Sequence, residues 1–123
     1  MADLSNEPNS INLVIVQGSD LSFSVTITDP TTDFTGATAR AKIVKDFASM
    51  TLVIALTCVV NTASNGLLTA TVSLTNAQTA GLTDTSAGQR TVNLGQWDFE
   101  VVLGSKVTRY MQGAATLSRE ATT

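Results

Sequence analysis

Apolar residues alternate strictly with serine and threonine along residues 21–28. Successive side chains of a β-strand point to opposite faces of a sheet, so this alternation places the apolar side chains on a buried face and the hydroxyl groups on the outer face. The same alternation recurs at residues 68–74 and 97–103. Three such segments in one chain predict an all-β protein with a single hydrophobic core.

The amino-acid composition agrees with one domain that folds without disulfides. A chain of 123 residues is long enough to bury about two-thirds of its unfolded surface. It has one cysteine, Cys58, so no disulfide can form within the chain. Only 14% of the residues are charged, whereas serine and threonine are abundant. Burial against partner proteins and solvation by hydroxyl groups explain such a surface equally well.

Charge and hydropathy argue against several functional classes. The net charge of −3 and the absence of a basic run argue against binding to a nucleic-acid backbone. The first residues lack the positive region and the apolar core of a secretory signal. The longest apolar run, residues 52–60, is too short to cross a bilayer. We therefore expect a protein that is made in the cytoplasm and stays out of membranes.

The order of apolar segments and turn residues predicts the domain boundaries. We expect a flexible N-terminal arm at residues 1–10, a β-sandwich domain at residues 11–118 and a C-terminal tail at residues 119–123. The dense apolar run at residues 11–17 predicts a strand that is covered on both faces. Further strands are predicted at residues 37–44, 51–60 and 113–118. Turns or loops are predicted at residues 18–20, 29–33 (with Pro30), 61–66 (with an Asn-Gly pair) and 83–95.

One short helical turn is predicted near residues 75–80. Thr75 and Gln78 form a capping box, in which the threonine side chain binds the amide of Gln78 and the glutamine side chain reaches back to the amide of Thr75. Gly81 then stops the helix.

A tight hairpin is predicted at Gly104 and Ser105, a two-residue loop of the type that begins with glycine. This loop sets the register of the flanking strands. The expected facing pairs are Leu103 with Lys106, Val101 with Thr108, Phe99 with Tyr110, and Glu100 with Arg109 as a cross-strand ion pair.

The core is predicted from the inward positions of these strands. Its expected members are Phe23, Val25, Ile27, Ile54, Leu56, Val72, Trp97, Phe99, Val101 and Tyr110. In the strand at 51–60, Leu52 is also predicted to point inward, and so is Cys58, which we interpret as a small core residue.

Candidate catalytic, cofactor-binding and metal-binding residues are not found in the sequence. The chain has no histidine, the commonest general base and metal ligand. Asp29 and Asp33 flank a turn without the spacing of a calcium loop. Asp98 and Glu100 lie two residues apart on one strand and are interpreted as a solvated strand surface. The six aromatic residues are too few for a nucleic-acid stacking surface or a sugar-binding groove. We therefore expect no enzymatic activity and no cofactor.

Five segments in sequence order carry a resemblance to a known group of proteins. They are Gln17–Phe23, Asp33–Ile43, Leu74–Leu82, Trp97–Val101 and Val107–Gly113. Together they resemble small virion proteins of tailed bacteriophages, some of which form the N-terminal, fibre-attachment domains of upper baseplate proteins. The resemblance covers about residues 13–120 and implies a single immunoglobulin-like antiparallel β-sandwich of about seven to eight strands. Its elements are turns and core positions, so it carries over no functional site.

The resemblance implies a non-enzymatic virion structural protein, assembled in the cytoplasm of a bacterial host. A tail or baseplate adaptor that joins fibres to the particle is the first interpretation, and a capsid cement or decoration protein on the phage head is the alternative. A third interpretation, an adhesion or carbohydrate-binding module, requires aromatic-rich loops, which this chain lacks. The implied partners are other virion proteins (baseplate, fibre or major capsid protein) in an oligomeric particle, with no nucleic acid, membrane or small-molecule substrate. The polar arm at residues 1–10 is expected to order against such a neighbour.

Overall fold

The computed structural model describes residues 9–45, 51–82 and 91–119. Within them lie seven β-strands and one short helix. Their bounds are β1 (Asn9–Ser10), β2 (Leu13–Val16), β3 (Leu21–Asp33), β4 (Thr38–Val44), β5 (Leu52–Leu74), α1 (Asn76–Ala80), β6 (Thr91–Leu103) and β7 (Lys106–Ser118). The all-β prediction is confirmed.

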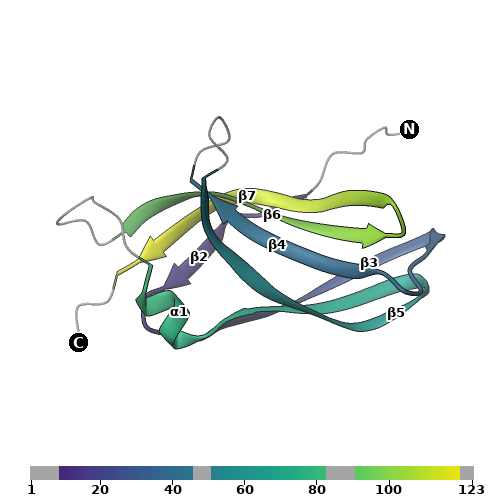
Figure 1. The fold of residues 1–123 in the computed structure, drawn as a ribbon, viewed down its shortest axis with the longest axis horizontal. Helices are drawn as coiled ribbons and strands as arrows, with labels where there is room; N and C mark the ends of the chain where they lie inside the picture. The colour runs from purple at the N-terminus through teal and green to yellow at the C-terminus, as the bar shows by residue number, and fades with distance from the viewer. Residues whose placement is uncertain (1–8, 46–50, 83–90, 120–123) are drawn as a thin grey trace.

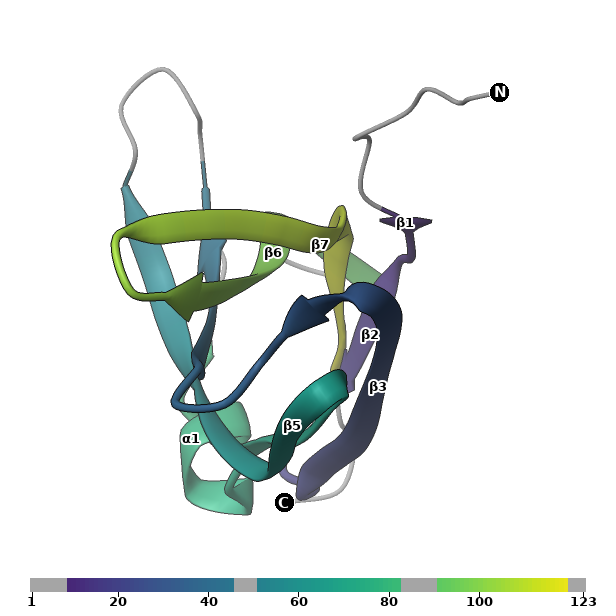
Figure 2. The same cartoon turned by 90° about the vertical axis from the view of Figure 1, so that its right-hand side faces the viewer.

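The strands form one curled mixed sheet. Its hydrogen-bonded order is β1-β7-β6-β4-β5-β3, and β2 also pairs with β7. The first half of β5 pairs with β4 and its second half pairs with β3, so β5 passes from one layer to the other (Figures 1 and 2). β1 and β2 run parallel to β7, whereas the other pairs are antiparallel. The prediction of a purely antiparallel sheet is therefore wrong for the N-terminal strands.

The core fills the space inside this curl. Of the predicted core residues, seven are buried: Val25, Ile27, Leu56, Val72, Trp97, Phe99 and Val101. The remaining three are half-buried and pack against the core: Phe23, Ile54 and Tyr110. Leu52 is exposed instead of pointing inward, because the β4–β5 register shifts between Ile43 and Val44. The Phe23 ring meets the Trp97 ring edge-on, at 6.0 Å between ring centroids and 82° between planes.

Two predicted turns lie inside continuous strands. Residues 61–66 do not reverse the chain, because β5 runs straight through them from β4 to β3. Residues 29–33 form an irregularity within β3, where the register shifts between Thr28 and Asp33 opposite Gly66. Gly66 has a φ of +85°, and a Cβ added there would lie close to the backbone of residues 29 and 30. The Asn-Gly pair therefore marks a local distortion of the strand and not a hairpin.

The N-terminal strand differs from its prediction in two ways. β2 is covered on one face only, since Leu13 and Ile15 are buried while Val14 and Val16 are 56% and 51% exposed. The core lies on the inner face of the curled sheet, so alternate residues of β2 point away from it, which the dense apolar run did not reveal. Residues 9 and 10, assigned to the flexible arm, pair with β7 as β1, and residues 1–8 of that arm lie outside the described residues.

The other elements follow the predicted pattern closely. The Thr75 hydroxyl accepts a hydrogen bond from the amide of Gln78 (3.2 Å), and the Gln78 side chain accepts one from the amide of Thr75 (2.8 Å). This confirms the capping box, and α1 ends at Gly81 as predicted. β6 starts at Thr91, so the last part of the predicted loop at 83–95 is strand, while residues 83–90 lie outside the described residues.

Candidate functional site

The β6–β7 hairpin places several polar side chains on the outer surface. Gly104 has a φ of +62°, as the predicted hairpin loop requires. Three of the predicted pairs are confirmed: Leu103 with Lys106, Val101 with Thr108, and Glu100 with Arg109.

The predicted pairing of Phe99 with Tyr110 is wrong, because Phe99 faces Met111. One extra residue on β7 lies opposite the junction of Phe99 and Glu100, which is the two-against-one arrangement of a β-bulge. The Tyr110 ring packs edge-on against Phe34 instead, with 6.5 Å between ring centroids. Nothing in the alternating pattern of the hairpin signals this contact between distant segments.

A group of polar residues, here called the charged face, covers the outer side of β4, β6 and β7. Its members are Arg40, Lys42, Asp98, Glu100, Arg109 and Gln112. Strand register lines them up in two cross-strand rows, Lys42–Asp98–Gln112 and Arg40–Glu100–Arg109. The two acids therefore share the central strand, and the basic residues stand on the strands that flank it.

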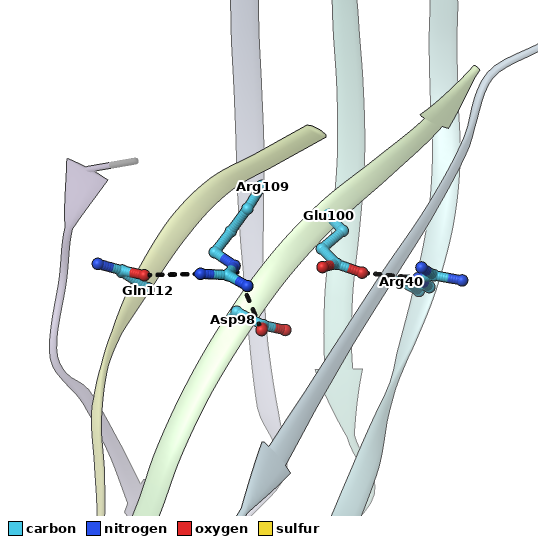
Figure 3. Close-up of polar contacts among 5 residues, drawn as sticks. All are labelled: Arg40, Asp98, Glu100, Arg109 and Gln112. Carbon is cyan, nitrogen blue, oxygen red and sulfur yellow. Dashed lines mark hydrogen bonds and ion pairs between the residues drawn. The ribbon is translucent and has the colours of Figure 1, made fainter. Parts of the chain in front are cut away.

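The ion pairs within the charged face differ from the predicted one. Glu100 pairs with Arg40, whose Nε lies 2.8 Å from Oε1, and not with Arg109 (Figure 3). The Nε of Arg109 lies 3.6 Å from Oδ2 of Asp98, and its Nη1 donates to the side-chain oxygen of Gln112 at 3.3 Å. Arg40 and Arg109 both stand opposite Glu100 in the strand register, so the direction of the side chains decides which of them pairs with Glu100.

The acids of this face are recessed and the arginines stand above them. The side chains of Asp98 and Glu100 are only 15% and 17% exposed, against 62% for Arg40 and 47% for Arg109. Burial, with a smaller contribution from Glu100, raises the pKa of the Asp98 carboxyl above its ordinary value. Ion pairs that involve exposed side chains add little to folding stability, so these two pairs contribute little to holding the strands together.

A second group of contacts fastens the N-terminal segment to β7. The indole N–H of Trp97 donates to the carbonyl oxygen of Ile11 at 2.7 Å, and the amide of Ile11 donates to the carbonyl of Gln112 at 2.8 Å. The side chain of Asn12 accepts from the amide of Ala114 at 3.2 Å. A Cβ on Gly113 would lie 2.1 Å from the Ile11 carbonyl oxygen, so only glycine allows this approach. The sequence predicted that Trp97 lies in the core, but not that its indole N–H binds the N-terminal segment at Ile11.

The turn between β2 and β3 is joined to α1 through a buried threonine. The Thr79 hydroxyl accepts from the amide of Gly18 (3.0 Å) and donates to the carbonyl of Ser19 (2.8 Å). Asp20 accepts from the amide of Asn76 at 2.6 Å. Thr79 is buried although it is polar. Its position on the inner side of the capped turn was a sequence signal for this contact, but the contact was not predicted.

Other chemically reactive groups are few in the described part of the chain. Cys58 is half-buried, and burial raises the pKa of its thiol, which disfavours the nucleophilic thiolate. Among residues 9–45, 51–82 and 91–119, no three histidine, cysteine or acidic side chains gather closely enough to hold a metal ion. No helix in these ranges is long and apolar enough to span a bilayer.

No protein-family model matches the chain, and a search of curated proteins finds no relative.

Proposed function

We propose that this protein is a non-enzymatic structural subunit of a tailed-phage particle, a tail or baseplate adaptor that joins fibres to the virion. In this proposal its fold is the immunoglobulin-like sandwich, with β4, β6 and β7 in one layer and β3 with the second half of β5 in the other (Figure 1). Its partners are other virion proteins, and it acts as a bound member of an oligomeric assembly.

One observation carries the proposal: the segments that resemble phage virion proteins contact one another in space. Gln17–Phe23 binds Leu74–Leu82 through the Thr79 hydroxyl and the Leu21–Leu74 strand pair. Trp97–Val101 pairs with Val107–Gly113. The resemblance therefore concerns linked, fold-determining positions rather than unrelated short matches, which supports a shared architecture.

The remaining segment joins the same network. Asp33–Ile43 contributes β4, in which Ala41 faces Phe99 and Ile43 faces Trp97. Gly36, at a φ of +82°, forms the turn that starts this strand, and an L-residue there would be strained.

Two features of the surface support a role in binding proteins. The charged face presents exposed arginines above recessed acids, and arginine is enriched at protein interfaces. β2 exposes two valines, and among the described strands it pairs on one side only. Each feature offers a different contact, as a part that joins two neighbours requires.

The proposal is tested on purified particles of the phage that encodes the chain. Quantitative mass spectrometry should find the protein at tens of copies or fewer per particle, and labelled antibody should mark the tail tip in electron micrographs. Hundreds of copies with label over the head would favour the capsid decoration protein instead. A chain missing from the particle, or a gene lying outside any phage or prophage genome, would contradict both.

The charged face is tested by a double variant. Arg40→Gln with Arg109→Gln should lower incorporation into particles while leaving the fold intact, because both arginines are exposed. Lys106→Gln, which removes an exposed charge from the hairpin outside the charged face, is the matched control and should incorporate normally. Normal incorporation of the double arginine variant would show that the charged face contacts no neighbour.

A further inference from the structure

The outer edge of β2 has backbone groups that no described residue binds. The amides of Ile11 and Gln17 both donate to carbonyls of β7, at 2.8 and 2.9 Å. In a parallel ladder, alternate residues direct both their N–H and C=O groups to the same neighbour, so the odd-numbered residues of β2 face β7. Val14 and Val16 therefore direct their N–H and C=O groups to the opposite edge, along which the described strands provide no partner.

The side chains along this edge are apolar and uncharged. Ile11, Val14 and Val16 are 45%, 56% and 51% exposed, and together they make up half of the exposed large apolar residues in the described part of the chain. Residues 9–19 contain no charged side chain at all. Natural edge strands are usually protected by a charge, a proline or a bulge. β3 has such protection in Pro30 and its irregularity, whereas β2 has none.

We propose that β2 pairs with β2 of a second copy of this chain, antiparallel, across a two-fold axis at Ile15. This register sets Val14 of each copy opposite Val16 of the other, so that each N–H of the two valines meets a C=O of the second copy. The carbonyl of Val16, which already accepts from the Ser19 amide at 3.1 Å, has a second lone pair for this bond. All open valine groups of both edges are thereby paired.

The register is also self-complementary in its side chains. Valine packs on valine at both positions, and the neighbouring rows of β7 bring Thr116 beside Val14 and Ser118 beside Val16. No like charges meet, since residues 9–19 are neutral. A two-fold contact of this kind closes on itself, and it joins the β7 layers of the two copies into one continuous sheet.

The size of the contact makes the dimer weak. A strand of four residues covers far less than the roughly 800 Å² per partner of a stable interface. We therefore expect reversible self-association in the range of about 0.1–1 mM protein, where the high local concentration of an assembly would favour it. This inference concerns the isolated chain, so its test can succeed or fail whether or not the virion function proposed above is right.

Sedimentation equilibrium of the full chain, from about 10 μM to about 1 mM, measures the association directly. The wild-type average mass should rise toward twice the monomer mass. Val14→Lys should weaken the association at least about tenfold, because a charged side chain on an edge strand opposes its pairing with a second strand. Val107→Lys, which changes a valine that is 47% exposed on the β6–β7 hairpin, is the matched control and should associate as the wild type does.

Amide hydrogen exchange at the two ends of the concentration range locates the contact. The amides of Val14 and Val16 should exchange several-fold more slowly at high concentration, whereas those of Leu13 and Ile15, already directed toward β7, should not change. A mass that stays monomeric throughout would overturn the proposal. So would a dimer that survives Val14→Lys, or one in which the Val14 amide shows no added protection.

Discussion

Replacing Gly113 with alanine should detach the N-terminal segment from β7. The new Cβ would lie 2.1 Å from the carbonyl oxygen of Ile11 and 2.7 Å from its carbonyl carbon, well inside the 3.4 Å at which ordinary contact begins. Both atoms belong to the backbone, so the strain cannot be relieved by turning a side chain. The segment must move away by more than about 1 Å, and the 2.7 Å bond from the Trp97 indole to Ile11 is then lost.

The expected cost follows from the bonds that this movement breaks. The Trp97 side chain is 2% exposed, so an indole N–H without an acceptor costs about 1–3 kcal/mol. Loss of the bond from the Ile11 amide to Gln112 adds about 1 kcal/mol. Leu13 and Ile15 keep β2 in the core, so the free energy of unfolding should fall by about 2–4 kcal/mol in total. For a domain of this size the thermal midpoint should fall by roughly 6–20 °C.

Urea denaturation followed by circular dichroism measures this loss. Gly81→Ala is the matched control, because Gly81 has a φ of −79° and an added Cβ there would make only ordinary contacts at 3.6 Å. Its unfolding free energy should stay within about 1 kcal/mol of the wild type. Trp97→Phe combined with Gly113→Ala should destabilise less than the sum of the single changes, since both break the same bond. If Gly113→Ala were as stable as the control, the close approach would not constrain the fold.

Three further predictions test other parts of the molecule. Gly104→Val should lower the free energy of unfolding by about 1–2 kcal/mol, because its φ of +62° disfavours a β-branched residue; equal urea midpoints would contradict this. Thr79→Val keeps the shape of the side chain but leaves the Gly18 amide without its acceptor, so the free energy of unfolding measured in urea should fall by about 1–3 kcal/mol. Thr79→Ser should retain most of the stability. Burial raises the pKa of Asp98, so the folded protein holds the proton of this carboxyl more tightly than the unfolded chain does. The stability should therefore fall as the pH rises from 3.8, the ordinary pKa of the group, through the raised pKa of the folded state. Thermal midpoints measured against pH should show a shallower fall in Asp98→Asn, and an unchanged slope would refute the assignment.

Features with a local cause could be predicted from the sequence. The alternation at 21–28 lies in β3, because the two faces of a strand are set residue by residue. The capping box at Thr75 and Gln78 and the loop at Gly104 depend on groups within a few positions of one another, and both occur as expected. The hairpin register followed from its loop as far as Glu100, since the loop determines the first cross-strand pairs.

Features that depend on distant segments appeared only in the tertiary structure. The bulge that displaces Tyr110 accompanies its packing on Phe34, a residue far away in the chain. β5 runs through the Asn-Gly signal because β4 and β3 offer it consecutive partners in two layers.

The candidate surfaces also depend on contacts between distant segments. The pairing of Glu100 with Arg40 rather than Arg109 depends on which strand lies on the other side of β6. The exposure of Val14 depends on which face of β2 the core covers. Local sequence determined the alternation of β3, the capped turn and the hairpin loop of this protein, because hydrogen bonds and side-chain alternation within a strand or turn are short-range. The order of the strands determined its surfaces, because which face is covered and which charges meet are properties of neighbours brought together by the core.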